Sequence, residues 1–542
     1  MSLVTWSWLF LAVYTAAMLA FGLIGQRRVQ SADDFATARG AYGPLTLGLA
    51  FAATTASGAT FIGFPGLTYD LGTAAVWAAV LYPCGVYLGV LICMRLVSQA
   101  GHRFGTRSIP EFLGERYQSD VLRIAVSLYS LLLFFYLAGQ LVSGLVMFET
   151  MLGLSEGWAL GITAVVLIVY VTLGGAHADI LTDGAQGLVM VLVGAGVIVL
   201  FVSGYGLDGG MAGVGGVLGS LEAQDEVLVG WLNLTDALTH SWWAIGAVLI
   251  AHIPLGMLPH IGNKLWALRD DRDRLRFVRL AFIFGLTLAM LGLGGLLARA
   301  ILGDALLAPG MTSNNALPAL FIQIFPTWLA ALLGVGILAA IMSTADGLVV
   351  SSSQIIANDL YRLTFVPRFR GELDSDTVDR RALRISRVMT VVVMAICTAM
   401  AWALMDMNVA LLVWIGVGGM MSAFAGPLVL GALWRGVTRA GAFSGFAVGA
   451  IVFGITHGGL IDSAWFGPGV LHELASWLQG EAPNPFSCAA MGEIASVGVT
   501  WGVSLVTRAL PNELLGDLFG EPEERRRQAQ AQVAEARYSR GP

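Results

Sequence analysis

The chain has 542 residues, of which 56% are hydrophobic and only 12% charged, with a formal net charge of −6. Soluble domains carry roughly 25% charged residues, so this composition indicates a membrane protein. A helix needs about 20 residues to cross a bilayer, and the apolar stretches use most of the chain. Too few residues remain for a soluble kinase, nuclease or dehydrogenase module.

Thirteen apolar stretches predict an all-α polytopic membrane protein with 13 transmembrane helices. In chain order they cover residues 3–25, 43–71, 73–97, 122–151, 156–174, 183–205, 241–260, 275–302, 327–360, 383–405, 408–434, 440–460 and 489–508. The first stretch has no basic segment before it, which favours a retained helix over a cleaved signal peptide. We expect one transmembrane domain over residues 1–510 and a charged cytoplasmic tail over 511–542.

The basic residues predict the orientation. When the thirteen stretches are threaded alternately, Arg299 is the only Lys or Arg on one side, and the other twenty-nine face the opposite side. Cytoplasmic loops collect Lys and Arg. We therefore expect a multi-pass protein of the cell membrane, inner or plasma, with an extracellular N-terminus and a cytoplasmic C-terminus.

The second stretch, 43–71, is longer than a straight helix needs, and glycines and a proline interrupt its middle at Gly58, Gly63, Pro65 and Gly66. Glycine weakens a helix and proline removes a backbone donor. Backbone groups freed at this depth are tolerated where they line a protein or aqueous cavity. The interruption predicts a broken helix at a binding site, and a kink made for close helix packing is the alternative.

A second interruption, with Pro254 and Pro259, lies in the stretch 241–260. Each interrupted stretch is the first of five, which together cover residues 43–205 and 241–434. Because five is odd, the two units have opposite orientations. This pattern predicts a 5+5 inverted repeat with two broken helices at the midplane, as in secondary transporters.

Four segments resemble the sodium:solute symporter family. They are residues 60–66 (TFIGFPG), 174–187 (GGAHADILTDGAQG), 339–346 (AAIMSTAD) and 424–427 (FAGP). The resemblance implies thirteen helices, ten of them in a leucine-transporter-like inverted repeat, and solute uptake coupled to Na⁺. The motifs are more similar to the pantothenate-, proline- and monocarboxylate-transporting branches than to the sugar transporters.

The resemblance also implies a Na⁺ site between the first broken helix and the ninth span. Its ligands would be the carbonyls of Ala53, Ala56 and Ala340 and the hydroxyls of Ser343 and Thr344. Neutral oxygens suit a hard cation that must also be released. Alternatively, the two hydroxyls bond carbonyls of their own helix.

Two carboxylates fall in apolar surroundings. The resemblance places Asp183 on the sodium release path. A compatible alternative is that Asp183 is an N-cap or first-turn carboxylate that complements the helix dipole. Asp346 lies within a long span, where an unpaired charge costs roughly 2.5–3.5 kcal/mol. We expect it to face the interior. The sequence leaves open whether it contacts Na⁺ or a neighbouring side chain.

Candidate solute contacts come from the two interruptions and the spans that face them. They are Thr60, Phe61, Trp77, Tyr136, Gln140, Trp242, His252 and Trp414. Tyr136 and Gln140 are four residues apart and share a helix face. Aromatic residues at these depths also serve packing and the interface belt. Few amide groups are available for a polyol, which favours a small carboxylate or amino acid-like solute over a sugar.

The sequence therefore predicts a sodium-coupled symporter that works by alternating access, with Na⁺ as its coupling ion. The implied partners are a small-molecule solute and the lipid bilayer, and nothing points to nucleic acid or to an obligatory protein partner. No nucleophile elbow, P-loop or HExxH motif supports an enzyme. Two alternatives remain: a proton-coupled carrier of the same fold and, more remotely, a solute-sensing membrane protein.

The orientation can be tested with a reporter that is active only in the cytoplasm. Fused after Pro542, the reporter should give signal, because the C-terminus follows an odd number of spans on the basic side. Inserted in the loop 206–240, which contains no Lys or Arg, it should give none. The reverse pattern would contradict both the span count and the inverted repeat.

Overall fold

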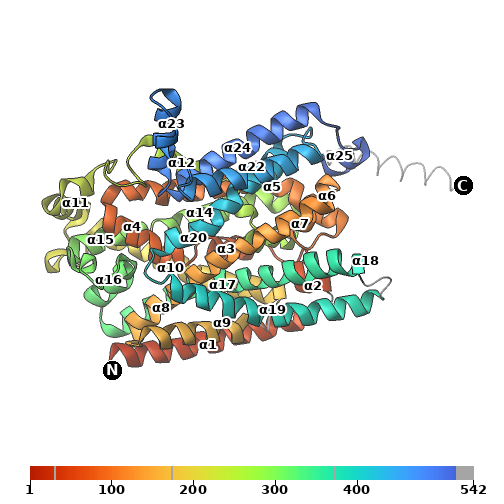
Figure 1. The fold of residues 1–542 in the computed structure, drawn as a ribbon. Helices are drawn as coiled ribbons and strands as arrows, with labels where there is room; N and C mark the ends of the chain where they lie inside the picture. Colours follow the sequence, from red (N-terminus) through yellow and green to blue (C-terminus); the bar gives the residue numbers. More distant parts are fainter. Residues whose placement is uncertain (30–31, 172–174, 370–373, 520–542) are drawn as a thin grey trace, which may run out of the picture.

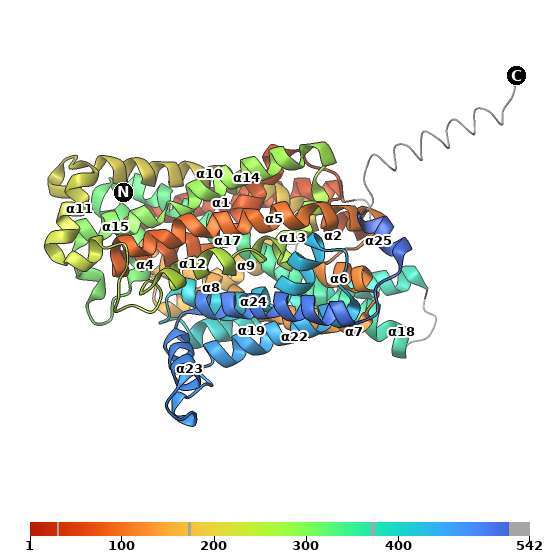
Figure 2. The same ribbon diagram turned by 90° about the horizontal axis from the view of Figure 1, so that it is seen from above.

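A computed structural model describes residues 1–29, 32–171, 175–369 and 374–519, and in these ranges the chain forms helices and no strand. The long helices lie side by side along one axis (Figure 1), and the view from above shows the same arrangement (Figure 2). They are α1 (Leu3–Arg28), α3 (Pro44–Thr55), α4 (Phe64–Leu71), α5 (Val76–Phe104), α7 (Asp120–Tyr129), α8 (Leu133–Leu152), α9 (Glu156–Val171), α10 (Gly175–Ser203), α12 (Trp242–Ala251), α14 (Arg274–Ala289), α15 (Gly292–Leu302), α17 (Thr327–Gln354), α19 (Ser375–Ala403), α20 (Val409–Phe424), α22 (Arg439–His457) and α24 (Pro485–Val506).

In the described ranges, 10 helices are long and apolar enough to cross a membrane, or 11 with one bent pair. The all-helical, multi-pass class is confirmed, while the count of 13 and the 5+5 repeat stay predictions. The difference arises partly because α4 and α5 form one stretch, Ala59–Phe104, which leaves α3 as a shorter apolar helix. In addition, α9 has 16 residues, and the end of its predicted span, 172–174, lies outside the described residues.

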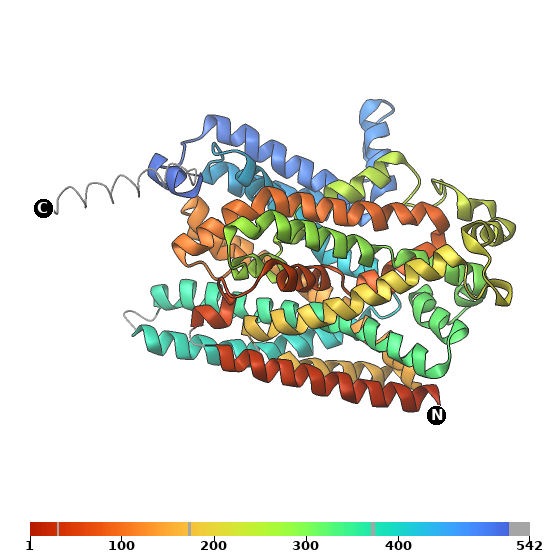
Figure 3. The same cartoon turned by 180° about the vertical axis from the view of Figure 1, so that it is seen from behind.

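Segments predicted to share a side of the membrane lie at the same end of the bundle. The N-terminus and α11 (Gly213–Gln224) are at one end in Figure 1. At the other end are α2 (Ala32–Thr37), α6 (Ile109–Tyr117), α18 (Val366–Phe369) and α25 (Asn512–Phe519), and Figure 3 shows α1 along the edge of the bundle between the two ends. Which end faces the cytoplasm stays a prediction.

Only the beginning of the predicted tail is described, because residues 520–542 lie outside the described ranges. That beginning contains α25, which is held at the end of the bundle by an ion pair between Arg103 and Asp517, 2.5 Å apart. The Arg116 guanidinium also lies 5.0 Å from the centre of the Phe519 ring. The first residues of the tail are therefore part of the packed structure.

The first predicted break is present. Helix α3 ends at Thr55, and the chain resumes as a π-helical segment, Ala59–Gly63, which runs into α4. At Gly58, between the two, an added Cβ would lie 2.3 Å from Ser143 Oγ of α8. Only glycine lets the backbone pass this close to α8, which explains why a residue so unfavourable in helices stands here.

The second break is also present. Helix α12 is followed by a 3-10 turn, Leu255–Met257, and by α13 (Pro259–Gly262), and the bend in this span is 54°. Its backbone lies against α5, because a Cβ added at Gly89 would be 1.6 Å from the Ile253 carbonyl oxygen. Because Gly89 has no side chain, the backbone of the second break can lie close to α5.

Gly89→Ala should destabilise the protein, because one added methyl group has no space beside Ile253. Overpacking of this kind costs about 1–3 kcal/mol, so the melting temperature of the purified transporter should fall by several degrees. Gly246→Ala, on α12, is the matched control, since a Cβ there meets nothing within 4 Å. Equal melting temperatures for the two variants would contradict the packing described.

Candidate functional site

The last backbone carbonyls of α3 are bound by hydroxyl groups from other helices. From α17, the Ser343 hydroxyl donates to Ala53 O at 3.1 Å and the Thr344 hydroxyl donates to Thr54 O at 3.1 Å. From α5, the Tyr82 hydroxyl donates to the Thr55 carbonyl at 2.6 Å. A helix end leaves carbonyls without helical partners, and here two neighbouring helices supply them.

The structure brings together the residues predicted to hold Na⁺. Ser343 Oγ and Thr344 Oγ1 also lie 3.1 and 3.4 Å from Ala340 O, within α17. Ala53 and Ala56 are fully buried, and Ala56 caps the C-terminal end of α3. Bonding within α17 explains only part of the hydroxyl contacts, because both groups also reach α3. Several neutral oxygens converge here, which is the chemistry that fits Na⁺.

A second set of polar groups lies at the break. The Gly58 N–H donates to Gln140 Oε1 on α8 at 2.9 Å. Gln140 is fully buried, and its amide nitrogen has no hydrogen-bond partner. One turn earlier on α8, the Tyr136 ring packs edge-on against His260, with 5.3 Å between ring centres. The amide nitrogen of Gln140 is therefore a free hydrogen-bond donor beside the first break.

Two of the predicted solute contacts belong to a buried aromatic cluster at the second break. The ring centre of His252 lies 4.5 Å from that of Trp414 and 5.0 Å from that of Tyr82. Phe486 of α24 completes the cluster, 4.6 Å from Trp414. Phe486 was not predicted, because nothing in the apolar sequence of α24 distinguishes it from a packing residue.

The remaining candidates divide into two groups. Thr60 and Phe61 are buried in the π-helical segment of the first break. Trp77 and Trp242 lie together elsewhere: Trp77 packs on Trp242 and also on Trp231 of the loop 206–240. Trp242 is 61% exposed. The structure thus separates this tryptophan pair from the buried groups at the two breaks.

Asp183 is not a helix-capping residue, contrary to one of the two interpretations of the sequence. Helix α10 begins at Gly175, so Asp183 lies two turns inside it. Residue 174, the first glycine of the sequence motif, lies outside the described residues. Asp183 is fully buried and accepts the Thr54 hydroxyl at 2.7 Å. It therefore contacts α3 next to the oxygens predicted to hold Na⁺.

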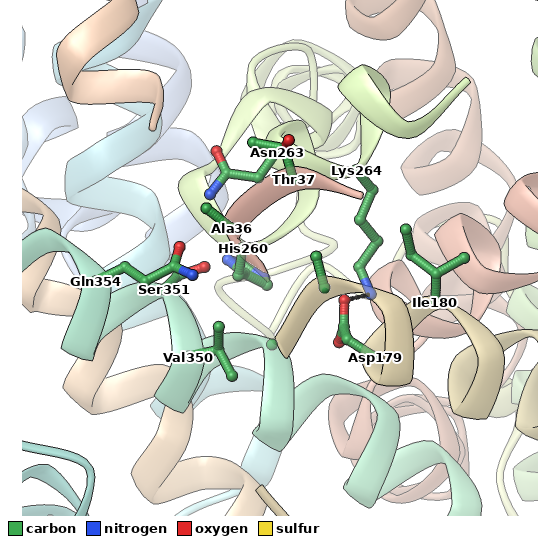
Figure 4. A pocket seen from close by; sticks show the side chains of 12 residues that line it. Ala36, Thr37, Asp179, Ile180, His260, Asn263, Lys264, Val350, Ser351 and Gln354 are labelled. Atoms are coloured by element: carbon green, nitrogen blue, oxygen red, sulfur yellow. Dashed lines mark ion pairs between the residues drawn. The ribbon is translucent and has the colours of Figure 1, made fainter. Parts of the chain in front are cut away.

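The sequence reasoning missed Lys264, which it counted among the basic residues of an inner loop. The Lys264 side chain is 3% exposed, and its ammonium lies 2.5 Å from Asp183 and 2.6 Å from Asp179. Figure 4 shows this side chain pointing to Asp179. Carboxylate oxygens of Asp179, Asp183 and Asp346 all lie within 4.8 Å of one another. Asp346 thus faces the interior, as predicted, next to two other carboxylates.

Comparisons with known proteins identify the family of the chain. The model of the sodium:solute symporter family matches residues 35–449. The sodium/pantothenate symporter of Escherichia coli strain K12 is 28% identical over 418 residues, which are 76% of this chain and 82% of that protein. A sodium/proline symporter of Staphylococcus aureus strain JH9 is 28% identical over 479 residues, 85% of this chain and 86% of that protein.

Two solved structures have the same fold. One is the substrate-bound outward-open state of a Na⁺-coupled sialic acid symporter, with a TM-score of 0.69 and 18% identity over 93% of this chain and 98% of that one. The other is a nucleobase-cation-symport-1 family transporter in a closed conformation with bromovinylhydantoin bound. Its TM-score is 0.51, with 12% identity over 89% of this chain and 96% of that one.

Replacing both predicted Na⁺-binding hydroxyls, by Ser343→Ala with Thr344→Ala, should weaken Na⁺ binding while leaving the helix intact, because alanine is a good helix former. A loss of about 1.4 kcal/mol would raise the half-maximal Na⁺ concentration for uptake about tenfold. Uptake of labelled solute into proteoliposomes, measured against external Na⁺, gives this value.

The matched control is Thr390→Ala with Thr398→Ala on α19. These hydroxyls donate to carbonyls of their own helix, those of Ser386 and Met394. The control should leave sodium activation unchanged. If the α17 double variant also left it unchanged, its hydroxyls would be structural and the proposed ligand set would be wrong.

Proposed function

The chain belongs to the sodium:solute symporter family, and from this premise we propose that it imports a small carboxylate or amino acid-like solute together with Na⁺ by alternating access. The family and the relatives are transporters, so the chain is a sodium-coupled transporter and not an enzyme. The observation that carries the proposal is that two sets of polar groups lie at one helix break. Oxygens that suit Na⁺ stand at the end of α3, before the break, and the amide of Gln140 on α8, which has a free donor, contacts Gly58 within it.

The two proposed sites are joined by a few residues of backbone. Na⁺ held by Ala53, Ala56 and the α17 hydroxyls would fix the end of α3. Two residues beyond Ala56, the Gly58 N–H donates to Gln140 Oε1. Na⁺ and the solute would therefore stabilise the same conformation of this segment. Binding of either one would then favour binding of the other, which is how the two are coupled.

The donors at the break favour a carboxylate. An ionised carboxylate only accepts hydrogen bonds, and the Gln140 amide nitrogen is a buried donor without a partner. Pantothenate and proline, for which two relatives are named, both carry a carboxylate. The buried cluster of His252, Trp414 and Phe486 would cover the less polar part of the solute.

The driving force is sufficient for accumulation. One charge that moves with Na⁺ across a potential of about 100 mV contributes about 2.3 kcal/mol, which corresponds to roughly fifty-fold accumulation before the Na⁺ gradient is counted. No ATP site is required.

The proposal retains thirteen spans, inverted repeats over 43–205 and 241–434, and an extracellular N-terminus in one transmembrane domain over residues 1–510. Its support is that a broken helix begins each repeat.

The function is tested by uptake of labelled small carboxylates and amino acids into proteoliposomes. A solute identified first by thermal shift should accumulate under an inward Na⁺ gradient and an inside-negative potential. A proton gradient without Na⁺ should not replace them. Accumulation driven by protons alone would make the chain a proton-coupled carrier, and binding without any uptake would favour a sensor.

The variant Gln140→Glu should distinguish a carboxylate solute, which accepts hydrogen bonds, from a solute that donates them. The new carboxylate still accepts the Gly58 N–H but replaces the free donor with an acceptor, which repels an anion. For a carboxylate solute, KM should rise about tenfold or more, the equivalent of about 1.4 kcal/mol. Gln479→Glu on α23 (Val470–Glu481) is the matched control and should leave KM unchanged. An unchanged KM in Gln140→Glu would contradict the proposed contact.

A further inference from the structure

The hairpin that joins α22 to α24 extends sideways from the bundle. It covers residues 458–484 and contains α23. Figures 1 and 2 show α23 running across the direction of the long helices, and Figure 3 shows the same arrangement from behind. Because the long helices cross the bilayer, a helix that runs across them lies along the plane of the membrane.

The position of α23 along the bundle axis is that of the ends of two spans. Trp477 of α23 packs on Trp243 in the first turn of α12, with 5.8 Å between ring centres. The Trp243 indole N–H donates to the Ser487 hydroxyl in the first turn of α24 at 2.7 Å. In Figures 1 and 2, α11 lies farther out along the axis than α23. Tryptophan gathers at this depth in membrane proteins, at the boundary between lipid and water.

One side of α23 is apolar and the other is polar. A helix has about 3.6 residues per turn, so residues spaced by three, four and seven positions share a side. The apolar side contains Val470, Leu471, Leu474, Trp477 and Leu478, and the opposite side contains Ser476 and Gln479. An apolar stripe along one side of a helix indicates that this side is covered.

No other part of the described chain covers most of this apolar side. Val470 is 79% exposed, Leu471 63% and Leu474 50%. Trp465, which precedes α23 in the hairpin, is 70% exposed. Contiguous apolar side chains exposed in this way mark an interaction surface.

The bilayer fits this surface by position and by charge. The two helices that flank the hairpin, α22 and α24, are apolar enough to cross the membrane, and Ile455 and Ile494 on them are also exposed. The surface of α23 therefore continues one that already faces lipid. Residues 440–507 contain no Lys or Arg, so attraction to anionic lipids does not contribute. Burial of apolar area would supply the binding.

We propose that α23 is an interfacial anchor whose apolar side lies among the lipid headgroups of the outer leaflet. The choice of leaflet follows from the predicted orientation. Such helices are buried about 5–10 Å into the boundary between headgroups and acyl chains. Through Trp477 and Trp243 the anchor fixes the start of α12, the helix that leads to the second break, relative to the membrane. The inference does not depend on the solute or on the coupling ion.

The test is the quenching of a fluorescent label on a single cysteine in proteoliposomes. Leu474→Cys places the label on the apolar side of α23, and Ser476→Cys places it on the polar side as the matched control. Both side chains are exposed, so neither substitution should disturb folding. Cys84, the one cysteine that is not buried, is replaced by serine in both variants.

The label at residue 474 should be quenched by a lipid nitroxide near the headgroup more than by one near the end of the acyl chain, because the helix lies at the interface. It should also be protected from iodide in the water. The label at residue 476 should be quenched by iodide. Replacing zwitterionic lipid with anionic lipid should not increase the quenching by nitroxide.

A second substitution tests the apolar contact itself. In the Leu474→Cys variant, Leu471→Ser should reduce quenching by the shallow nitroxide, because it removes apolar area that lipid would cover. Glu473→Ser, on the polar side, is the matched change and should have no such effect.

Two results would overturn the inference. Equal quenching by iodide at residues 474 and 476 would mean that both sides of α23 face water. Protection of residue 474 from iodide without quenching by either nitroxide would mean that protein, such as a second copy of the chain, covers the apolar side in place of lipid.

Discussion

Inside a bilayer no water is available for backbone groups, so an interrupted helix must be completed by side chains of its neighbours. The end of α3 follows this constraint closely. Its last carbonyls accept hydroxyls from α5 and α17, and the first N–H after the interruption donates to Gln140 of α8. The arrangement of three other helices around this point is the consequence, because each must bring a polar side chain to one short segment.

The same hydroxyls and carbonyls that complete the helix are chemically suited to Na⁺. Exchange between hydrogen bonding within the protein and ion coordination requires only small movements of Ser343 and Thr344, since both already lie 3.1 Å from carbonyls of α3. Thr54 extends the connection to the buried carboxylates through its hydroxyl. A change at one ligand position is therefore passed to the next through direct contacts.

The sequence predicted those features of the fold that depend on local chemistry. Glycine and proline located both breaks, because these residues act on the backbone where they stand. The motif around Ser343 and Thr344 predicted a pair of hydroxyls that the structure brings to α3. The number of spans stays a prediction, because the structure joins α4 and α5 into one continuous stretch, Ala59–Phe104, where the sequence predicts two spans that meet at residue 72.

Features that depend on distant contacts were not predictable in the same way. Lys264 was counted only among the basic residues of the inner side, and its burial became visible only through its packing against α10. Trp77 and Trp242 were grouped with the solute contacts, and the sequence did not indicate that Trp77 packs on Trp242 and on the exposed loop residue Trp231. Periodicity identifies a residue's helix and face, but it does not say which other segment lies opposite.

The central claim is that Na⁺ and solute act on one helix break. The most direct measurement is the equilibrium dissociation constant of the solute for the purified transporter at low and at saturating Na⁺, together with that of Na⁺ with and without solute. Coupling through a shared segment predicts that Na⁺ tightens solute binding about tenfold or more and that solute tightens Na⁺ binding by the same factor. A solute affinity that does not change with Na⁺ would contradict the account.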